Sequence, residues 1–354
     1  MNIANRGLRP ASLLKGAAAV VALAVLGRTL ASADLARAGS LVVQSGAWIV
    51  IGLVPYALAL AVDGLAWRML LGPVARPSLT SLILVRLRCD ALGATLPGGM
   101  LVGESLAPTW LRASMPLDIG VAAIAARKCL VGIAEGLYLV ASFAVGYSIL
   151  HARGAVLPWV VLALGAFMLA MFGGMSLALA SGNVAARVHA WLASLPIPAL
   201  RNGIESRARA FRSTDARLAT ILRAPPSRLA SACSLSLASW SIESLETWVL
   251  LGLVGVHLPI TTVFAFEASV SLLRSLGAFS PGGLGVQDVG YVAALGALGI
   301  PDAITAGAAF VVLKRTKELV WALLGYASLL STDVHRAPRE REPLPAGALR
   351  EARS

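Results

Sequence analysis

Two runs of charged residues lie inside apolar stretches of the sequence, and their side chains are of types that could do chemistry. The runs read IAARKCLVGIAEGLYL and AFVVLKRTKELVWALL, and their charged members are Arg127, Lys128 and Glu135 in the first and Lys314, Arg315, Lys317 and Glu318 in the second. Three of the four lysines of the chain belong to these runs. Because an ionisable side chain at membrane depth costs about 3 kcal/mol or more, we expect these charges to pair with one another or to face a wet cavity.

A Pro-Gly-Gly break followed by an acid precedes each run. Residues 97–104 read PGGMLVGE and residues 281–288 read PGGLGVQD, and the break residues are Pro97, Gly98, Gly99, Pro281, Gly282 and Gly283. Such a break frees backbone N–H groups and presents the positive end of the helix that follows. Glu104 and Asp288 are expected at the start of those helices. The expected ion pairs are Glu104 with Arg127 or Lys128, and Asp288 with Lys314 or Arg315.

Together these charges predict a polar, net cationic cavity that receives an anionic lipid head group. The residues expected to bind the lipid are Glu104, Arg127, Lys128, Gln287, Asp288, Lys314, Arg315 and Glu318. An alternative is that the charges only hold helices together, although buried ion pairs contribute little net stability. Asp63, Trp67 and Arg68 lie near the end of an apolar stretch and are interpreted as anchors at the membrane interface.

The composition shows what kind of elements must position these residues. Hydrophobic residues make up 57% of the 354 residues, charged residues only 14%, and the mean hydropathy is +0.78. A soluble protein carries about 25% charged residues. We therefore expect an all-α, polytopic integral membrane protein. The net charge of +12 does not indicate a nucleic-acid partner, because the arginines lie in loops between apolar stretches, as in the positive-inside bias.

Several apolar stretches reach the length of about 20 residues that crosses a bilayer. The expected full spans are 12–30, 47–71, 117–148, 155–181, 229–256 and 303–330. Residues 79–112 and 259–298 are cut by the two breaks, and each is expected to form two half-helices, either as a re-entrant hairpin or as a full crossing. The total is therefore about six to eight transmembrane helices. The first span is interpreted as a retained helix and not as a cleaved signal peptide.

The two breaks belong to an internal repeat. Residues 92–104 read LGATLPGGMLVGE and residues 276–288 read LGAFSPGGLGVQD, with a constant offset of 184. An offset three residues larger places the basic pair of the first charged run opposite Lys314 and Arg315. Chance similarity between apolar segments would not reproduce Pro-Gly-Gly with a following acid. The sequence therefore predicts a duplication, with halves at about 45–150 and 229–330.

The distribution of arginine predicts the orientation. Residues 183–228 hold eight arginines against two acids, which predicts that this segment lies in the cytoplasm. The membrane that the protein spans is expected to be the inner membrane of the cell. The basic N-terminus and the tail at 331–354, which is expected to be disordered, are assigned to the same side. The hairpin at 79–112 then enters from the cytoplasm and the hairpin at 259–298 from outside. Such inverted halves with broken helices are typical of secondary transporters.

Within residues 183–228, apolar side chains recur at helical spacing. They are Ile204, Ala208, Phe211, Leu218 and Leu222. The pattern predicts an amphipathic helix that lies on anionic lipid head groups. The alternative is a solvated basic loop.

Several of these motifs resemble a known family. Residues 67–71 (WRMLL), LPGGMLVGES, FSPGGLGVQD and the charged last span are similar to the flippase-like transmembrane domain of the lysylphosphatidylglycerol synthase superfamily, of the stand-alone type associated with hopanoid biosynthesis. The resemblance covers about 45–330. It implies translocation or delivery of a lipid, with matching positions at Glu104, Arg127, Gln287 and Asp288. The family often has Glu at the last position, and the soluble aminoacyltransferase domain of the full synthases is expected to be absent.

Three functions are consistent with these features. The first is flippase-like translocation or delivery of a hopanoid, phospholipid or lipid carrier. The alternatives are a membrane-embedded lipid-modifying enzyme, with Glu104 or Asp288 as base, and a scaffold for lipid-biosynthesis enzymes. The sequence has no Ser/His/Asp or Cys/His set, no nucleotide-binding loop, no HExxH and no CxxC. We therefore expect no catalytic residues, no cofactor, no metal and no structural disulfide.

Overall fold

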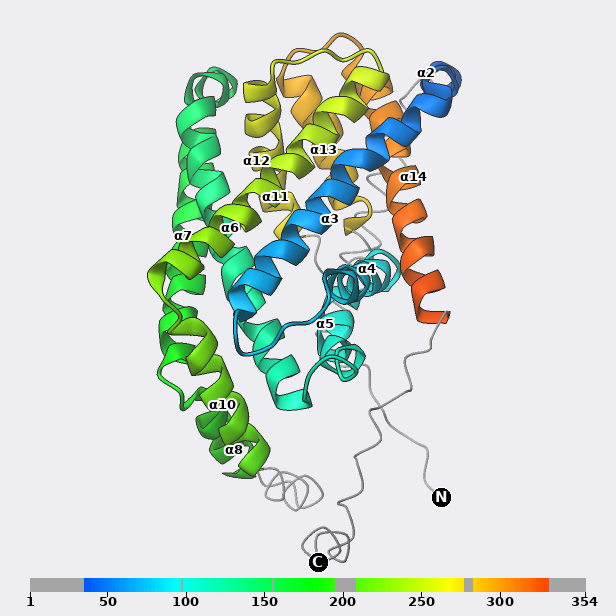
Figure 1. The fold of residues 1–354 in the computed structure, drawn as a ribbon. Coiled ribbons are helices and arrows are strands. Elements are labelled where there is room, and N and C mark those ends of the chain that lie inside the picture. Colours follow the sequence, from blue (N-terminus) through cyan, green and yellow to red (C-terminus); the bar gives the residue numbers. More distant parts are fainter. Residues whose placement is uncertain (1–34, 97, 155, 195–207, 277–282, 331–354) are drawn as a thin grey trace, which may run out of the picture.

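The computed structural model describes residues 35–96, 98–154, 156–194, 208–276 and 283–330. Every regular element in these ranges is a helix, and none of the described residues forms a strand (Figure 1). The predicted span 12–30 and the tail 331–354 lie outside the described residues, as do Pro97, Pro281 and Gly282. The all-α fold expected from the composition is confirmed.

The helices follow one another with short connections. Their bounds are α2 Leu35–Ser45, a 3₁₀ turn Gly46–Trp48, α3 Ile49–Leu71, α4 Leu79–Thr95, α5 Gly99–Trp110, α6 Leu117–Arg153, α7 Leu157–Ala180, α8 Val184–Ser194, α10 Ala208–Leu222, α11 Pro226–Leu253, α12 Ile260–Leu276, α13 Val286–Ala297 and α14 Ala303–Leu330.

Three helical segments among the described residues are both long and apolar enough to cross a membrane. They are Ala36–Leu71, Leu117–Ala152 and Leu157–Ala180. Helices α11 and α14 have 28 residues each, which corresponds to about 42 Å and exceeds a hydrocarbon core of about 30 Å. Their composition is less apolar, because α11 carries two glutamates and several serines and α14 carries the charged run 314–318. Helices α4 and α5, with 17 and 12 residues, are shorter than a normal span.

The described chain contains two similar sets of four helices, α3–α6 and α11–α14. In each set a long helix is followed by two short helices around a break and then by a second long helix. Glycines at matching positions allow the same close packing in both sets. Gly103 brings α5 against the backbone of α4, and Gly290 brings α13 against α12; Gly120 and Gly307 do the same for α6 and α14 against the preceding short helix. Both pairs of glycines are 187 residues apart, so the repeat extends through these helices.

The two sets are inverted relative to each other. One hydrophobic cluster joins the end of α3, the end of α5 and the start of α6 to α10; its members include Leu71, Leu111, Ile119 and Leu218. A second cluster joins the end of α11, the end of α13 and the start of α14 to α2; its members include Leu250, Leu295, Ala306 and Ala38. The α4–α5 hairpin therefore opens toward the end of the bundle that carries α10, and the α12–α13 hairpin opens toward the opposite end (Figure 1).

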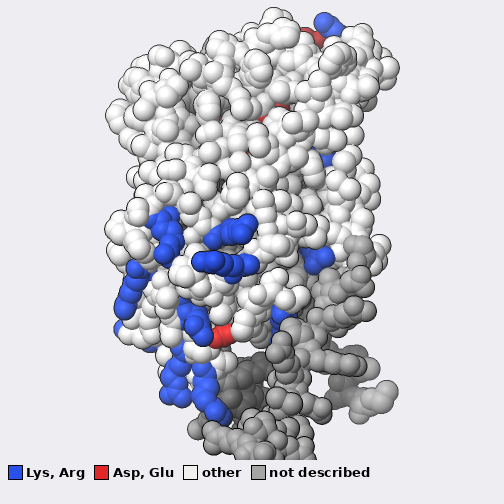
Figure 2. Space-filling model, in the orientation of Figure 1, with Lys and Arg blue, Asp and Glu red and all other residues white. Residues whose placement is uncertain are grey.

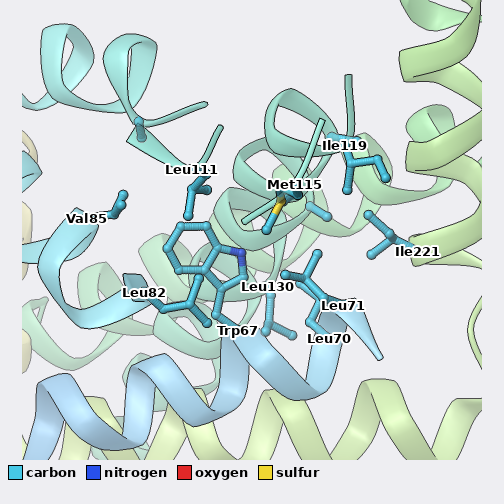
Figure 3. Close-up of a cluster of buried hydrophobic side chains, with 14 of the residues drawn as sticks. Trp67, Leu70, Leu71, Leu82, Val85, Leu111, Met115, Ile119, Leu130 and Ile221 are labelled. Atoms are coloured by element: carbon cyan, nitrogen blue, oxygen red, sulfur yellow. The ribbon is translucent and has the colours of Figure 1, made fainter. Parts of the chain in front are cut away.

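Trp67 fills the centre of the first cluster. Figure 3 shows its ring among Leu82, Leu111, Met115 and Leu130, which come from α4, from α6 and from the turn between α5 and α6. The ring is almost fully buried. Because this cluster packs the base of the first hairpin between α3 and α6, it fixes where the hairpin enters the bundle.

The basic segment is helical where it is described, so the solvated-loop alternative is wrong for these residues. The apolar face of α10 is covered by protein, since Leu218, Ala219 and Ile221 are buried where α10 packs on α6, α7 and α8. The carboxylate of Asp215 accepts hydrogen bonds from two N–H groups in the first turn of α8, at 2.8 Å each. The exposed arginines of this segment are Arg187, Arg209, Arg212, Arg217 and Arg223. Figure 2 shows Lys and Arg gathered over this end of the molecule, whereas the opposite end is almost uncharged on this face.

Candidate functional site

A cavity of about 510 Å³ lies between the two sets of helices. Residues from all eight helices of α3–α6 and α11–α14 line it. Both breaks reach its wall, because Gly99 belongs to the first break and Gly283 to the second. The cavity is therefore shaped by the helix interruptions and not only by gaps between long helices.

The conformation of the first break requires glycine. Gly98 caps α5 with φ at +67°, in the left-handed region that L-residues with a side chain rarely adopt. A Cβ on Gly99 would overlap the carbonyl oxygen of Leu92, so the chain can turn here only without a side chain. In the second break Gly283 has φ at +68° and Gly285 has φ at +84°.

The second break is longer than the first by three residues. Helix α5 begins at Gly99, directly at the first Pro-Gly-Gly, whereas an additional turn over 283–285 precedes α13. Glu104 therefore lies in the second turn of α5, one helical turn later than expected, and with the offset of 187 it corresponds to Tyr291 and not to Asp288. The equivalence of the two acids that the offset of 184 predicted is wrong, because the insertion falls between the glycines and the acid.

In the first set, the basic pair of α6 bridges two neighbouring helices. Nζ of Lys128 lies 2.8 Å from Oε1 of Glu104 on α5, which is one of the two expected pairings. Arg127 instead binds Asp63 of α3, with 2.6 Å between Nη2 and Oδ2, and its guanidinium stacks on the ring of Trp67 at 5.1 Å. The interpretation of Asp63 and Trp67 as interface anchors is wrong, because both are buried; Asp63 lines the cavity. Arg68 is exposed.

In the second set, Asp288 caps the N-terminus of α13 and links this helix to α14. One oxygen of its carboxylate accepts the N–H of Gly285 at 3.0 Å, and the other accepts Nε of Arg315 at 2.9 Å. Arg315 also binds Glu318, with 2.6 Å between Nη1 and Oε2. Asp288 is only 1% exposed and, like Arg315, does not line the cavity. These two residues are placed to position helices, not to touch a ligand.

The two lysines of α14 point to other carboxylates. Nζ of Lys317 lies 2.7 Å from Oε1 of Glu246 on α11 and 4.5 Å from the ring centre of Tyr56. Nζ of Lys314 lies 3.6 Å from Oε1 of Glu267 on α12 and 4.8 Å from the ring centre of Tyr291. The carboxylate of Glu267 also accepts the hydroxyl of Thr247.

Most of the residues expected from the sequence to bind the lipid meet at the cavity. Those that line it are Glu104, Arg127, Lys128, Gln287, Lys314 and Glu318. The sequence interpretation missed Glu243 and Glu246 of α11, and it did not assign Arg86 and Asp90 of α4 to the site. The sequence does indicate Glu243 and Glu246, because the stretch SIESLETW places these two acids three residues apart within an apolar segment. Tyr56 gave no signal of its own; its hydroxyl donates to Asp90 at 2.8 Å.

The charge of the cavity wall is the reverse of the expectation. Among the described residues that line it there are eight carboxylates and five cations, an excess of three negative charges when all are ionised. The predicted net cationic cavity is therefore wrong. Five of the eight acids come from α3, α4, α11 and α12, outside the two charged runs, so the runs alone gave the wrong sign.

Several buried polar atoms of the cavity wall have no hydrogen-bond partner among the described residues. They are Arg127 Nε, Ser236 Oγ, Glu246 Oε2, Tyr291 Oη and Trp321 Nε1. Leaving such an atom unsatisfied costs about 1–3 kcal/mol. A ligand with both hydrogen-bond donors and acceptors would satisfy them. No group of three or more His, Cys, Asp or Glu side chains within the described residues could hold a metal ion, and Cys89, Cys129 and Cys233 are free thiols.

Comparison with curated proteins and with solved structures gave no match. A protein-family model does match, and it covers residues 12–315, which include both breaks, both sets of helices and all but Glu318 of the cavity residues expected from the sequence. The family resemblance noted in the motifs is thereby confirmed. The chain belongs to the family described as the lysylphosphatidylglycerol synthase transmembrane region.

Proposed function

We propose that the protein translocates a polar-headed lipid between the two leaflets of the inner membrane, through the cavity between its inverted halves. The observation that carries this proposal is a charged cavity of about 510 Å³ lined by the helices of an apolar membrane protein. A polar head group cannot cross the hydrocarbon core without losing its hydration, and a cavity of this kind replaces that hydration with side-chain partners. The size lies within the range of about 300–1,000 Å³ found for small-molecule sites.

The inverted arrangement supports alternating access to the cavity. Broken helices that enter from opposite sides and meet at a charged site are the architecture of many secondary transporters, in which one half rocks against the other. The two hairpins of this chain open to opposite ends of the bundle, so movement of either hairpin would expose the cavity to one side. The basic end that carries α10 faces the cytoplasm in this proposal.

The excess of carboxylates favours a head group that carries an ammonium group. This replaces the anionic head group expected from the sequence. The family takes its description from a synthase of lysylphosphatidylglycerol, and a lysyl group bears ammonium groups at neutral pH. A phospholipid, hopanoid or lipid carrier with an amino group would have the same chemistry.

The proposal is tested by lipid translocation in proteoliposomes. Phosphatidylethanolamine and phosphatidylglycerol, each labelled with a fluorophore on an acyl chain, report movement between leaflets when a membrane-impermeant reductant bleaches the outer leaflet. We expect protein-dependent bleaching of the inner-leaflet pool, faster for phosphatidylethanolamine, and a decrease of at least tenfold in rate for Glu104→Gln.

The matched control is Asp302→Asn, which makes the same acid-to-amide change at an exposed residue outside the cavity. Translocation at protein-free rates, or a Glu104→Gln rate equal to that of the control, would contradict the proposal. A chemically altered lipid recovered after incubation would instead favour the membrane-embedded lipid-modifying enzyme.

A further inference from the structure

Helix α13 is held on the long helix that follows it by buried contacts. The carboxylate of Asp288, whose side chain is only 2% exposed, pairs with Arg315 of α14. The rings of Phe266 on α12, Tyr291 on α13 and Phe310 on α14 are almost fully buried and contact one another, with 5.1–6.3 Å between centroids. Aromatic pairs at this separation stabilise packing beyond the effect of burial alone. Helices α12, α13 and α14 therefore form one packed block.

Helix α5 is held on α6 in a different way. Its Glu104, which corresponds to Tyr291 in the repeat, pairs with Lys128 of α6 at 2.8 Å, and the two side chains are 18% and 45% exposed. Among the described residues, this is the one ion pair or side-chain hydrogen bond that joins α5 to a long helix. An ion pair of this exposure contributes little to stability. The position that carries a buried aromatic ring in the second half therefore carries a weak, part-exposed ion pair in the first.

The packing of α5 on α6 is also less close than that of α13 on α14. A Cβ on Gly120 of α6 would have Pro108 of α5 as its neighbour, with 3.3 Å to the nearest atom. A Cβ on Gly307 of α14, the equivalent residue, would lie 2.9 Å from the side chain of Val292 on α13 and 3.1 Å from its Cα atom. Helix α14 therefore approaches α13 more closely than α6 approaches α5.

Helix α5 also presents an exposed apolar face. Leu101, Val102 and Leu106 on this face are 64%, 44% and 42% exposed, whereas Val292 and Leu295 of α13 are buried. In a membrane protein an exposed apolar face meets lipid chains, which are fluid, whereas a protein interior is close-packed. An outward movement of α5 therefore displaces lipid and not protein.

A gap between α5 and α6 would lead directly into the cavity. Gly99, Met100 and Glu104 of α5 and Lys128 and Val131 of α6 line its wall. The turn between the two helices lies at the end of the bundle that carries α10. Such a gap would therefore face the leaflet on that side of the membrane.

We propose that α5 is the gate of the cavity: α5 separates from α6 when the Glu104–Lys128 ion pair opens, whereas α13 stays on α14. This inference rests on the proposed function and adds the route by which the lipid reaches the site. The head group passes between α5 and α6, and the acyl chains remain in the bilayer beside the exposed face of α5. An ammonium head group that binds Glu104 takes the place of Lys128, so binding of the substrate weakens the contact that closes the gate. No covalent bond changes in this step.

Two engineered disulfides test the gate, and one is the matched control of the other. In one variant Pro108 and Gly120 are replaced with cysteine, which links α5 to α6, and in the other Val292 and Gly307 are replaced, which links α13 to α14. The two Cβ atoms would lie 3.4 Å apart in the first pair and 3.3 Å apart in the second, close to the lower end of the range of about 3.5–4.5 Å found in disulfides. The native cysteines are replaced with serine in both variants.

Translocation of fluorescent short-chain phosphatidylethanolamine in proteoliposomes is followed by extraction with albumin, because a bleaching reductant would open the disulfides. We expect oxidation of the α5–α6 variant to slow translocation at least tenfold, and a thiol reductant to restore it. Oxidation of the α13–α14 variant should leave the rate unchanged. Equal slowing by both disulfides, or undiminished translocation by the oxidised α5–α6 variant, overturns the gate.

A second measurement does not depend on translocation. Spin labels on cysteines at Thr109 and Val121 report the distance between α5 and α6, and labels at Ala293 and Val312 report that between α13 and α14; all four positions are exposed. Lys128→Gln removes the ion pair. We expect it to add a component several ångströms longer to the first distance and to leave the second unchanged. A first distance that does not change, or equal changes in both, overturns the proposal.

The gate and the proposed function fail in different ways. Translocation that continues when α5 is linked to α6 overturns the gate and leaves the proposed function standing. If the protein without disulfides does not translocate lipid, the proposed function is contradicted. The spin-label distances then still decide whether α5 moves.

Discussion

Asp288 and Arg315 lie behind the wall of the cavity, whereas Glu104 and Lys128 lie on it. The two ion pairs differ in exposure, because the Lys128 side chain is 45% exposed and that of Asp288 only 2%. Removing one partner of a buried pair leaves an uncompensated charge, which costs about 3–5 kcal/mol. An exposed pair contributes about 1 kcal/mol or less. The two acids that look equivalent in the repeated motif therefore have different roles.

Asp288→Asn and Glu104→Gln separate these roles. We expect Asp288→Asn to lower the free energy of unfolding by about 3 kcal/mol, because Arg315 loses a buried partner. Glu104→Gln should change it by about 1 kcal/mol or less and yet reduce translocation strongly. Thermal unfolding of the detergent-solubilised variants, followed by circular dichroism, gives the first quantity. Equal destabilisation by both substitutions would show that Glu104 is a structural residue like Asp288.

Local motifs allowed the prediction of some ion pairs and not of others. The pairs of Glu104 with Lys128 and Asp288 with Arg315 join helices that are adjacent in the sequence, so the repeated motif was enough to suggest them. The pairs of Asp63 with Arg127 and of Glu246 with Lys317 span 64 and 71 residues. These depend on which long helices cross, and neither periodicity nor composition determines that crossing.

At the scale of elements, one glycine in each hairpin lets the two short helices pack closely. The atoms that an added Cβ would contact differ between the two glycines. A Cβ on Gly103 would approach the backbone of Cys89 at 2.8 Å, so α5 would have to move away from α4. A Cβ on Gly290 would meet the end of the Leu273 side chain, which can rotate away. Small residues of this kind let membrane helices approach closely.

We expect Gly103→Ala to destabilise the protein by about 1–3 kcal/mol, the usual cost of overpacking a fixed core, and Gly290→Ala by clearly less. Gly173→Ala is the control, since a Cβ at this position on α7 would have no other atom within 4 Å and alanine favours helix. Midpoints of thermal unfolding compare the three variants. A larger loss for Gly290→Ala than for Gly103→Ala would mean that the α4–α5 packing is adaptable.

Helix α10 illustrates why an amphipathic pattern does not determine what covers the apolar face. The spacing of apolar residues predicted the helix, but a face that meets lipid and a face that meets protein have the same periodicity. In the structure that face packs on α6, and the side left free carries arginines such as Arg209 and Arg212. Contact with anionic lipid stays a prediction, now assigned to the arginine face.

Replacing Arg209 and Arg212 with Gln tests this contact. Each basic residue near an anionic surface contributes about 1 kcal/mol at physiological ionic strength. We expect the double variant to lose most of any stimulation of translocation by anionic lipid in the vesicles, and the wild type to lose the same stimulation at high salt. Stimulation that survives the double substitution would assign the effect to another part of the molecule.

At the scale of the whole molecule, the inverted repeat could be predicted from one motif and the charge of the loops. The Pro-Gly-Gly motif occurs twice, each time followed by an acidic residue, which predicts the repeat. The arginines of the 183–228 segment predict which side of the membrane each hairpin enters from. The sign of the cavity charge could not be predicted, because it is a sum over eight helices and the strongest sequence signals are the two basic runs. The repeat places the two runs at corresponding positions of the two halves. The acids that line the cavity from the other helices outnumber the cations of these runs.

This architecture requires that both ends of each hairpin lie on one side of the membrane. The turn before α4 and the turn after α5 must share a side with α10, and the turns before α12 and after α13 must share the other. Single cysteines at Arg76, Ser114 and Ala216 are exposed positions for the first group, and His257 and Ala297 serve for the second. The native cysteines are first replaced with serine.

A membrane-impermeant thiol reagent added to intact cells should label the cysteines at positions 257 and 297. It should label those at 76, 114 and 216 only after the membrane is opened. If the α4–α5 hairpin crossed the membrane completely, positions 76 and 114 would be labelled from opposite sides. That result would contradict the inverted re-entrant arrangement, and the argument for access to the cavity from both sides would no longer hold. Labelling of 76, 114 and 216 from one side and of 257 and 297 from the other leaves the cavity between hairpins that enter from opposite sides, as alternating access requires.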